Sequence, residues 1–91
     1  MDGQSNLPYE TIEDELYTQQ AIEIEPDTKK LDERLRYVLW VIARVPLDCS
    51  KVPNTNLRRI VDDRHPQLRI WFTFDGVRIV LRSIERYENN G

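Results

Sequence analysis

The sequence predicts an α+β domain in which a long helix packs on one face of a small antiparallel sheet. The clearest observation is a hairpin pattern over residues 67–87, where Asp75-Gly76 joins two alternating apolar runs. An Asp-Gly pair in this setting is the strongest short-range hairpin signal. Helically spaced apolar residues precede the hairpin over residues 29–44, and a strand-like alternation lies ahead of them over residues 21–25. The predicted order is therefore strand, long helix and C-terminal β-meander.

The first part of the chain, residues 1–20, is expected to form an acidic arm outside the compact domain, which would span residues 21–91. Pro8 is tolerated in the first turn of a helix. A helical stripe of apolar residues follows, so the arm is expected to be partly helical. The stripe consists of Tyr9, Ile12, Leu16 and Tyr17. The domain would begin with the strand AIEIE at residues 21–25, which Pro26 ends.

The long helix has a start signal and a stop signal. Asp27 stands directly before the helical pattern, where an N-cap side chain is expected, and Pro46 follows its last turn. The apolar positions recur at helical spacing, so this helix is predicted to cover the sheet. They are Leu31, Leu35, Val38, Leu39, Ile42 and Val45.

The segment between the long helix and the hairpin is less regular. Residues 47–56 contain Pro53 and predict a loop. Residues 57–61 fit either a short helix or a strand. A helix would place Arg58 and Arg59 at its N-terminal end, against the helix dipole, so a strand is favoured.

The hairpin register predicted from an Asp75-Gly76 turn sorts the side chains onto two faces. One face is apolar and is expected to pack on the long helix: Leu68, Ile70, Phe72, Phe74, Val77, Ile79 and Leu81. The other face carries Arg69, Trp71, Thr73, Arg78, Val80, Arg82 and, if the strand continues, Ile84 and Arg86. In this register Arg69 lies opposite Arg82, and facing like charges destabilise a sheet. The arginine face is therefore either solvated or a phosphate site.

Charge is distributed unevenly along the 91 residues, whose net charge is −3. Residues 1–28 contain eight acidic groups and no Lys or Arg. Residues 29–91 contain all thirteen basic groups against eight acidic ones, an excess of +5, and ten of the thirteen are Arg. Guanidinium groups are suited to bidentate phosphate recognition. The asymmetry indicates a nucleic-acid partner for the basic part and an acidic arm that competes for it.

Several classes of protein are disfavoured. No apolar run is long enough to span a bilayer, and the N-terminus has no signal-peptide pattern, so a soluble cytoplasmic protein without a membrane partner is expected. Cys49 is the single cysteine and His65 the single histidine. They leave no intramolecular disulfide and no recognisable metal-ligand spacing.

The stretch NLRRIVDDRHPQLRIWFTFDGVRIVLRSIERY, residues 56–87, resembles the C-terminal half of the RelE/ParE toxin superfamily. In that family a strand and a turn precede an Arg-bearing strand with the pattern R-[IV]-x-[YF], an acidic-Gly turn and a hydrophobic last strand that ends in basic and aromatic residues. The resemblance covers roughly residues 21–87, because the strand AIEIE and the long helix also stand in the family's order. Two departures are the twenty residues ahead of that strand and a Pro-containing loop in place of a second helix.

The resemblance implies a bacterial toxin of a type II toxin–antitoxin pair, acting on mRNA as a metal-independent endoribonuclease without a cofactor. The implied partners are RNA or the ribosome and a cognate antitoxin. By position in the last two strands, the implied catalytic residues are Arg69, Arg82, Arg86 and Tyr87. Arg69 and Arg82 would clamp phosphate, and Tyr87 or His65 would assist proton transfer.

Further nucleic-acid contacts are assigned to the residues around this set. Trp71 would stack on a base, and the remaining cations would bind the backbone: Arg78, Arg58 and Arg59. Alternative functions stay open at this point. They are a non-catalytic nucleic-acid- or protein-binding module with the same arginine face, a gyrase-directed member of the superfamily, and a degenerate member whose acidic arm shields the site.

Overall fold

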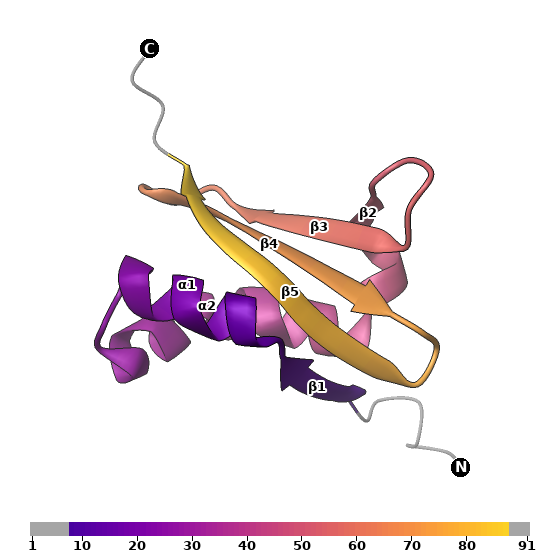
Figure 1. Cartoon of the computed structure of the whole chain (residues 1–91), viewed down its shortest axis with the longest axis horizontal. Coiled ribbons are helices and arrows are strands. Elements are labelled where there is room, and N and C mark those ends of the chain that lie inside the picture. The colour runs from indigo at the N-terminus through magenta and orange to yellow at the C-terminus, as the bar shows by residue number, and fades with distance from the viewer. Residues whose placement is uncertain (1–7, 88–91) are drawn as a thin grey trace.

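The structure is a computed structural model that describes residues 8–87 (Figure 1). The first seven residues of the predicted arm and residues 88–91 lie outside this range. The elements are β1 (Glu10–Glu13), α1 (Glu15–Ile24), α2 (Thr28–Arg44), a 3-10 helix η2 (Pro46–Asp48), β2 (Ser50–Lys51), β3 (Leu57–Asp62), β4 (Gln67–Phe74) and β5 (Arg78–Tyr87). The strands form one five-stranded sheet in the order β1-β5-β4-β3-β2. Strand β1 runs parallel to β5, and the other neighbours are antiparallel. The predicted α+β class is confirmed, with a mixed sheet.

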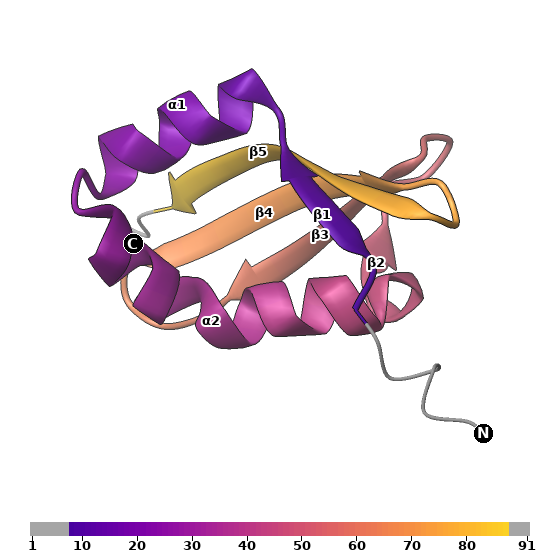
Figure 2. The same cartoon turned by 90° about the horizontal axis from the view of Figure 1, so that it is seen from below.

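Both helices lie on the same side of the sheet (Figures 1 and 2). Helix α2 starts where the sequence predicts, because Asp27 Oδ1 accepts hydrogen bonds from the backbone N–H groups of Lys29 (3.1 Å) and Lys30 (3.3 Å). It ends before Pro46, as predicted. Its buried residues recur at spacings of three and four and form one face: Leu31, Leu35, Val38 and Ile42.

The predicted core is confirmed in its main features. Five of the side chains predicted for the core, all from β4 and β5, are at most 2 % exposed and pack with the buried face of α2. They are Leu68, Ile70, Phe72, Ile79 and Leu81. Leu39 is partly buried against the same core.

The N-terminal segment differs most from the prediction. Residues 8–20 were expected as a partly helical arm, but they supply the edge strand β1 and the first part of α1. Tyr17 is only 3 % exposed and belongs to the core, whereas Leu16 is 51 % exposed, so the predicted stripe is not one helical face. The boundary predicted between residues 20 and 21 falls inside α1.

The predicted strand at residues 21–25 is also wrong, because most of it is the end of α1. The alternation of Ile22 and Ile24 suggested a strand. However, Tyr17, Ala21 and Ile24 also recur at helical spacing, and these are the residues that α1 turns toward the core. The helical face therefore prevails over the short β pattern. A strand followed by two helices now precedes the meander.

The hairpin turn lies one residue later than predicted. Asp75 Oδ1 accepts hydrogen bonds from the backbone N–H groups of Val77 (2.8 Å) and Arg78 (2.7 Å), so Gly76 and Val77 form the turn. Gly76 has φ +97°, which suits the first central position of a two-residue hairpin turn. Phe74 consequently pairs with Ile79 rather than Val77. Val77, predicted in the core, is 72 % exposed.

A β-bulge in β5 changes the register again. Phe72 pairs with Leu81 but Trp71 pairs with Ser83, which leaves Arg82 as the extra residue. One inserted residue moves every later side chain of β5 to the opposite face from the one predicted. Ile84 is therefore buried at 1 % exposure.

The later turn and the bulge together remove the predicted pairing of Arg69 with Arg82. Arg69 lies opposite Glu85, and Arg86 lies opposite Leu68. A cross-strand pair of opposite charge replaces a pair of like charges, which is the favourable arrangement.

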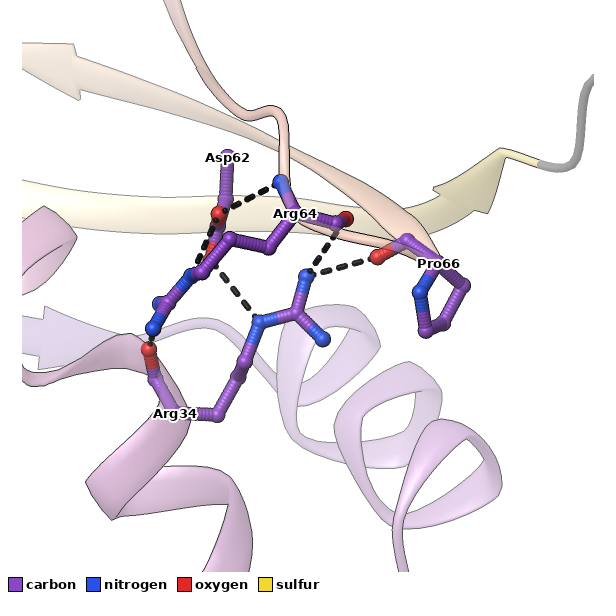
Figure 3. Close-up of polar contacts among 4 residues, drawn as sticks. All are labelled: Arg34, Asp62, Arg64 and Pro66. Carbon is purple, nitrogen blue, oxygen red and sulfur yellow. Dashed lines mark hydrogen bonds and ion pairs between the residues drawn. The ribbon is translucent and has the colours of Figure 1, made fainter.

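A buried carboxylate joins α2 to the turn between β3 and β4 (Figure 3). Asp62 is 7 % exposed and accepts hydrogen bonds from Arg64 Nη2 (2.8 Å) and Arg34 Nε (2.9 Å). Arg34 Nη2 also donates to the carbonyl oxygens of Arg64 and Pro66, while Arg64 Nη2 donates to the carbonyl of Arg34. Hydrogen bonds from Arg64, and then from Arg34, hold the pKa of Asp62 well below its usual range. The network fixes this turn, including His65, to the helix.

Candidate nucleic-acid interface

The face of the sheet opposite the helices is called the open face here. Directly paired residues share a face in an antiparallel sheet, so the register assigns its members. Three rows cross the sheet: Val61–Arg69–Glu85, Arg59–Trp71–Ser83 and Leu57–Thr73–Val80. Gln67 pairs with Tyr87 at one end of this face, and Arg78 and the bulged Arg82 complete it.

Arg69 is held in a defined orientation at the end of the open face. Its guanidinium carbon lies 3.9 Å from the centroid of the Tyr87 ring, and its Nε donates to Gln67 Oε1 at 2.9 Å. Arg69 and Tyr87 occupy diagonal cross-strand positions, which long side chains can bridge. A cation–π contact at an exposed site contributes about 0.5–1 kcal/mol. The guanidinium is thus ordered before any anion binds.

Acidic groups from the N-terminal segment pair with two other arginines of the open face. Arg78 Nε lies 3.2 Å from Glu10 Oε1, and Arg82 Nη1 lies 3.1 Å from Asp14 Oδ2. Arg82 Nε also donates to Thr73 Oγ1 at 3.2 Å. Since β1 pairs with β5, the acidic segment lies beside these cations. The attraction between the acidic segment and the basic domain that composition predicts takes the form of these two ion pairs.

A shallow depression lies where the bulge disturbs the open face. Trp71 contributes an aromatic ring to it, Arg82 a cation, and Glu85 and Asp14 carboxylates; its lining is Asp14, Leu16, Leu57, Trp71, Arg82, Ser83 and Glu85. Sequence reasoning missed Glu85 and Ser83 as site residues. In the register without a bulge they fall on the helix side, so no signal in the sequence pointed to them.

The eight predicted site residues divide between the two faces. Six lie on the open face: Arg59, Arg69, Trp71, Arg78, Arg82 and Tyr87. The structure brings Arg69 together with Tyr87, and Trp71 together with Arg82. It does not bring Arg69 and Arg82 together as the predicted opposed pair.

Arg58 and Arg86 do not share the open face. Strand neighbours point to opposite faces, so Arg58 points to the helix side while Arg59 does not. Arg58 Nη1 donates to the carbonyl of Cys49 at 3.0 Å, a contact that holds the loop before β2. Arg86 lines a cavity with Leu31 and Arg34 of α2. The bulge places Arg86 there.

Neither a membrane-spanning helix nor a metal-binding cluster is found in the part of the chain that the structure describes. Within residues 8–87, no helix is long and apolar enough to cross a membrane. Over the same residues, no group of three or more His, Cys, Asp or Glu side chains is placed to hold a metal ion.

Comparison with known proteins identifies a solved structure with a similar fold. No protein-family model matches the chain, and no curated protein sequence matches it. Among solved structures, it is similar to a chain in the crystal structure of the toxin–antitoxin complex RelBE2 from Mycobacterium tuberculosis, with a TM-score of 0.67. The sequence identity is 12 %, and the match covers 91 % of this chain and 95 % of that chain. The resemblance noted in residues 56–87 is thus supported at the level of the fold: the chain has the fold of a component of a toxin–antitoxin complex.

Proposed function

We propose that this protein is the toxin of a toxin–antitoxin pair and that it binds RNA on the open face of its sheet. One observation carries the proposal. The helices close one face of a sheet of this fold, and the opposite face presents four arginines and two aromatic rings: Arg59, Arg69, Arg78, Arg82, Trp71 and Tyr87. Cations and exposed rings on a sheet are the combination that single-stranded nucleic acid requires.

The binding is proposed to rest on phosphate contacts. The four arginines would each donate charge-assisted hydrogen bonds to phosphate oxygens. Trp71 is partly exposed beside Arg82, so its ring is available to stack on a base. Most of the affinity then comes from neutralised phosphates and is salt-dependent.

The proposed reaction is metal-independent cleavage of the RNA strand. The 2′-oxygen attacks the adjacent phosphorus, the bond to the 5′-oxygen breaks, and the products carry a 2′,3′-cyclic phosphate and a 5′-hydroxyl. A base must take the 2′-proton, an acid must protonate the 5′-oxygen, and a cation must stabilise the negative charge on the nonbridging phosphate oxygens. Glu85 lies in the depression, opposite Arg69 and two residues from Tyr87 in β5, so we assign it as the base. Tyr87 is assigned as the proton donor.

Regulated expression in bacterial cells tests this proposal, with growth and RNA integrity followed over time. The wild-type protein should arrest growth and cleave RNA, and purified protein should yield 2′,3′-cyclic ends. Glu85→Gln should abolish cleavage while binding persists, since the base is lost but the cations remain. Asp63→Asn, at an exposed carboxylate in the β3–β4 turn, is the matched control and should cleave normally. Full cleavage by Glu85→Gln, or by Arg82→Ala, would exclude this site.

A second candidate is an RNA-binding module without nuclease activity. A specific observation favours it, because the observed register does not pair Arg69 with Arg82, and Arg82 already forms an ion pair with Asp14. In this case RNA would bind with the same salt dependence, but the strand would stay intact on prolonged incubation. Binding and cleavage assays on the same purified protein separate the two functions.

A further inference from the structure

The outward face of α2 carries an exposed aromatic pair that the proposed RNA site does not use. Tyr37 is 71 % exposed and Trp40 is 51 % exposed. Their rings lie nearly parallel, with centroids 6.4 Å apart and 12° between the planes. The Arg44 guanidinium carbon lies 4.8 Å from the Trp40 centroid. Large rings left on a helix surface in this way are typical of an interaction site.

A groove runs beside this aromatic pair, between α2 and the β3–β4 turn. It is lined by Glu33, Arg34, Arg36, Tyr37, Trp40 and Arg64. Two of the side chains that line the groove are held in place, because Arg34 and Arg64 are both hydrogen-bonded to the buried Asp62 (Figure 3). Tyr, Trp and Arg are the residues most enriched where binding energy concentrates in protein interfaces. The groove therefore suits an apolar partner surface that carries acidic groups.

The same chain presents such a surface on α1. The outward side of this helix is aliphatic and acidic, and no Lys or Arg lies anywhere in residues 8–25. Ile22 is 49 % exposed, whereas Leu16, on the flank of the helix, lines the depression of the open face. At helical spacing the outward side consists of Glu15, Gln19, Ile22 and Glu23.

We infer that the protein self-associates, with α1 of one copy seated on the aromatic and basic face of α2 in a second copy. Ile22 would cover the Tyr37–Trp40 pair, and the acidic groups would face Arg36 and its neighbours. Both helices lie on the same side of the sheet (Figures 1 and 2), so a two-fold arrangement can seat both α1 helices at once. The open face points away and stays free for RNA.

A nucleic-acid ligand is the less favoured occupant of this face. The Arg44 guanidinium lies over the Trp40 ring, and the Tyr37 ring lies beside the Trp40 ring. Part of the ring surface on which a base could stack is therefore already covered. Glu33 in the groove wall also repels phosphate. An acidic protein helix can form ion pairs with the arginines and, unlike a nucleic-acid base, does not need to stack between the rings.

Sedimentation equilibrium of the full chain, from micromolar to millimolar concentration, tests the inference. The wild type should form dimers that weaken as salt rises. Trp40→Ala should weaken association by about tenfold or more, because it removes the central aromatic contact. Arg36→Glu and Glu23→Lys should each prevent dimers, since each sets like charges across the contact.

The most decisive experiment mixes the two charge-reversed proteins. A heterodimer of Arg36→Glu with Glu23→Lys pairs opposite charges at both contacts, so the mixture should dimerise although neither protein does alone. Lys51→Glu, the same type of reversal on β2, is the control and should dimerise like the wild type. A wild-type protein that stays monomeric, association that both reversals leave intact, or a mixture that stays monomeric would each overturn the inference. Unchanged RNA binding by Arg36→Glu distinguishes this surface from the open face, and its loss would assign the surface to RNA instead.

Discussion

Removing the acidic partners of the open-face arginines should strengthen RNA binding. Glu10 and Asp14 each lie within about 3 Å of a guanidinium that the proposed site uses. An RNA phosphate must displace these carboxylates or share their arginines. The neutral variants Glu10→Gln and Asp14→Asn keep the side-chain size and leave Arg78 and Arg82 free to bind phosphate.

The size of the effect follows from the exposure of the pairs. The Arg78 and Glu10 side chains are 52 % and 62 % exposed, and those of Arg82 and Asp14 are 47 % and 38 % exposed. Ion pairs of this kind contribute about 0.2–1 kcal/mol after screening by solvent. Each substitution should therefore raise RNA affinity by about 1.4- to 5-fold, with the larger gain for the less exposed Asp14.

Fluorescence anisotropy with a labelled single-stranded RNA at low ionic strength measures this gain. The difference from the wild type should shrink as salt is added, because screening weakens the original pairs. Asp63→Asn removes a carboxylate from the β3–β4 turn and serves as the control for a change in net charge. An affinity for Glu10→Gln and Asp14→Asn no higher than that of Asp63→Asn would show that these acids do not compete with RNA.

Three other predictions follow from the fold. Phe72→Ala should lower the free energy of unfolding by about 3–5 kcal/mol in chemical denaturation, because its side chain is fully buried; a loss under about 0.5 kcal/mol would contradict the core assignment. Asp62→Asn should cost about 1.5–3 kcal/mol at neutral pH through its bond to Arg34. The Asp62 pKa is lowered in the folded state, so this stabilisation is present above the unfolded pKa of about 3.9 and is lost as pH falls further; a pH-independent difference would refute it. Arg58→Ala should leave RNA affinity unchanged, because Arg58 faces the helix side; weaker binding would contradict that placement.

The elements fixed by one dominant pattern could be predicted from the sequence. Helix α2 carries a capping Asp27, a single apolar stripe and a terminating Pro46, all in agreement. The apolar face of β4 was equally clear, because strand alternation assigns it whichever register is chosen. These features place the core and most of the open face correctly.

The remaining features depend on contacts that no local pattern encodes. Residues 10–24 support both helical and strand readings, and only pairing with β5 and packing of Tyr17 decide between them. The turn shifts because the Asp75 carboxylate binds two backbone N–H groups. The bulge at Arg82 has no sequence signal, yet it decides the faces of Glu85 and Arg86.

The salt dependence of RNA binding tests the central claim most directly. The affinity of the wild type for a single-stranded RNA should fall linearly with salt on a log–log plot, and Arg69→Ala and Arg82→Ala should each flatten the slope by about 0.7 to 1. Arg36→Ala, which removes an exposed arginine from α2, should leave the slope unchanged. An affinity that does not respond to salt, or equal slopes for the wild type, Arg69→Ala and Arg82→Ala, would contradict an RNA site on the open face.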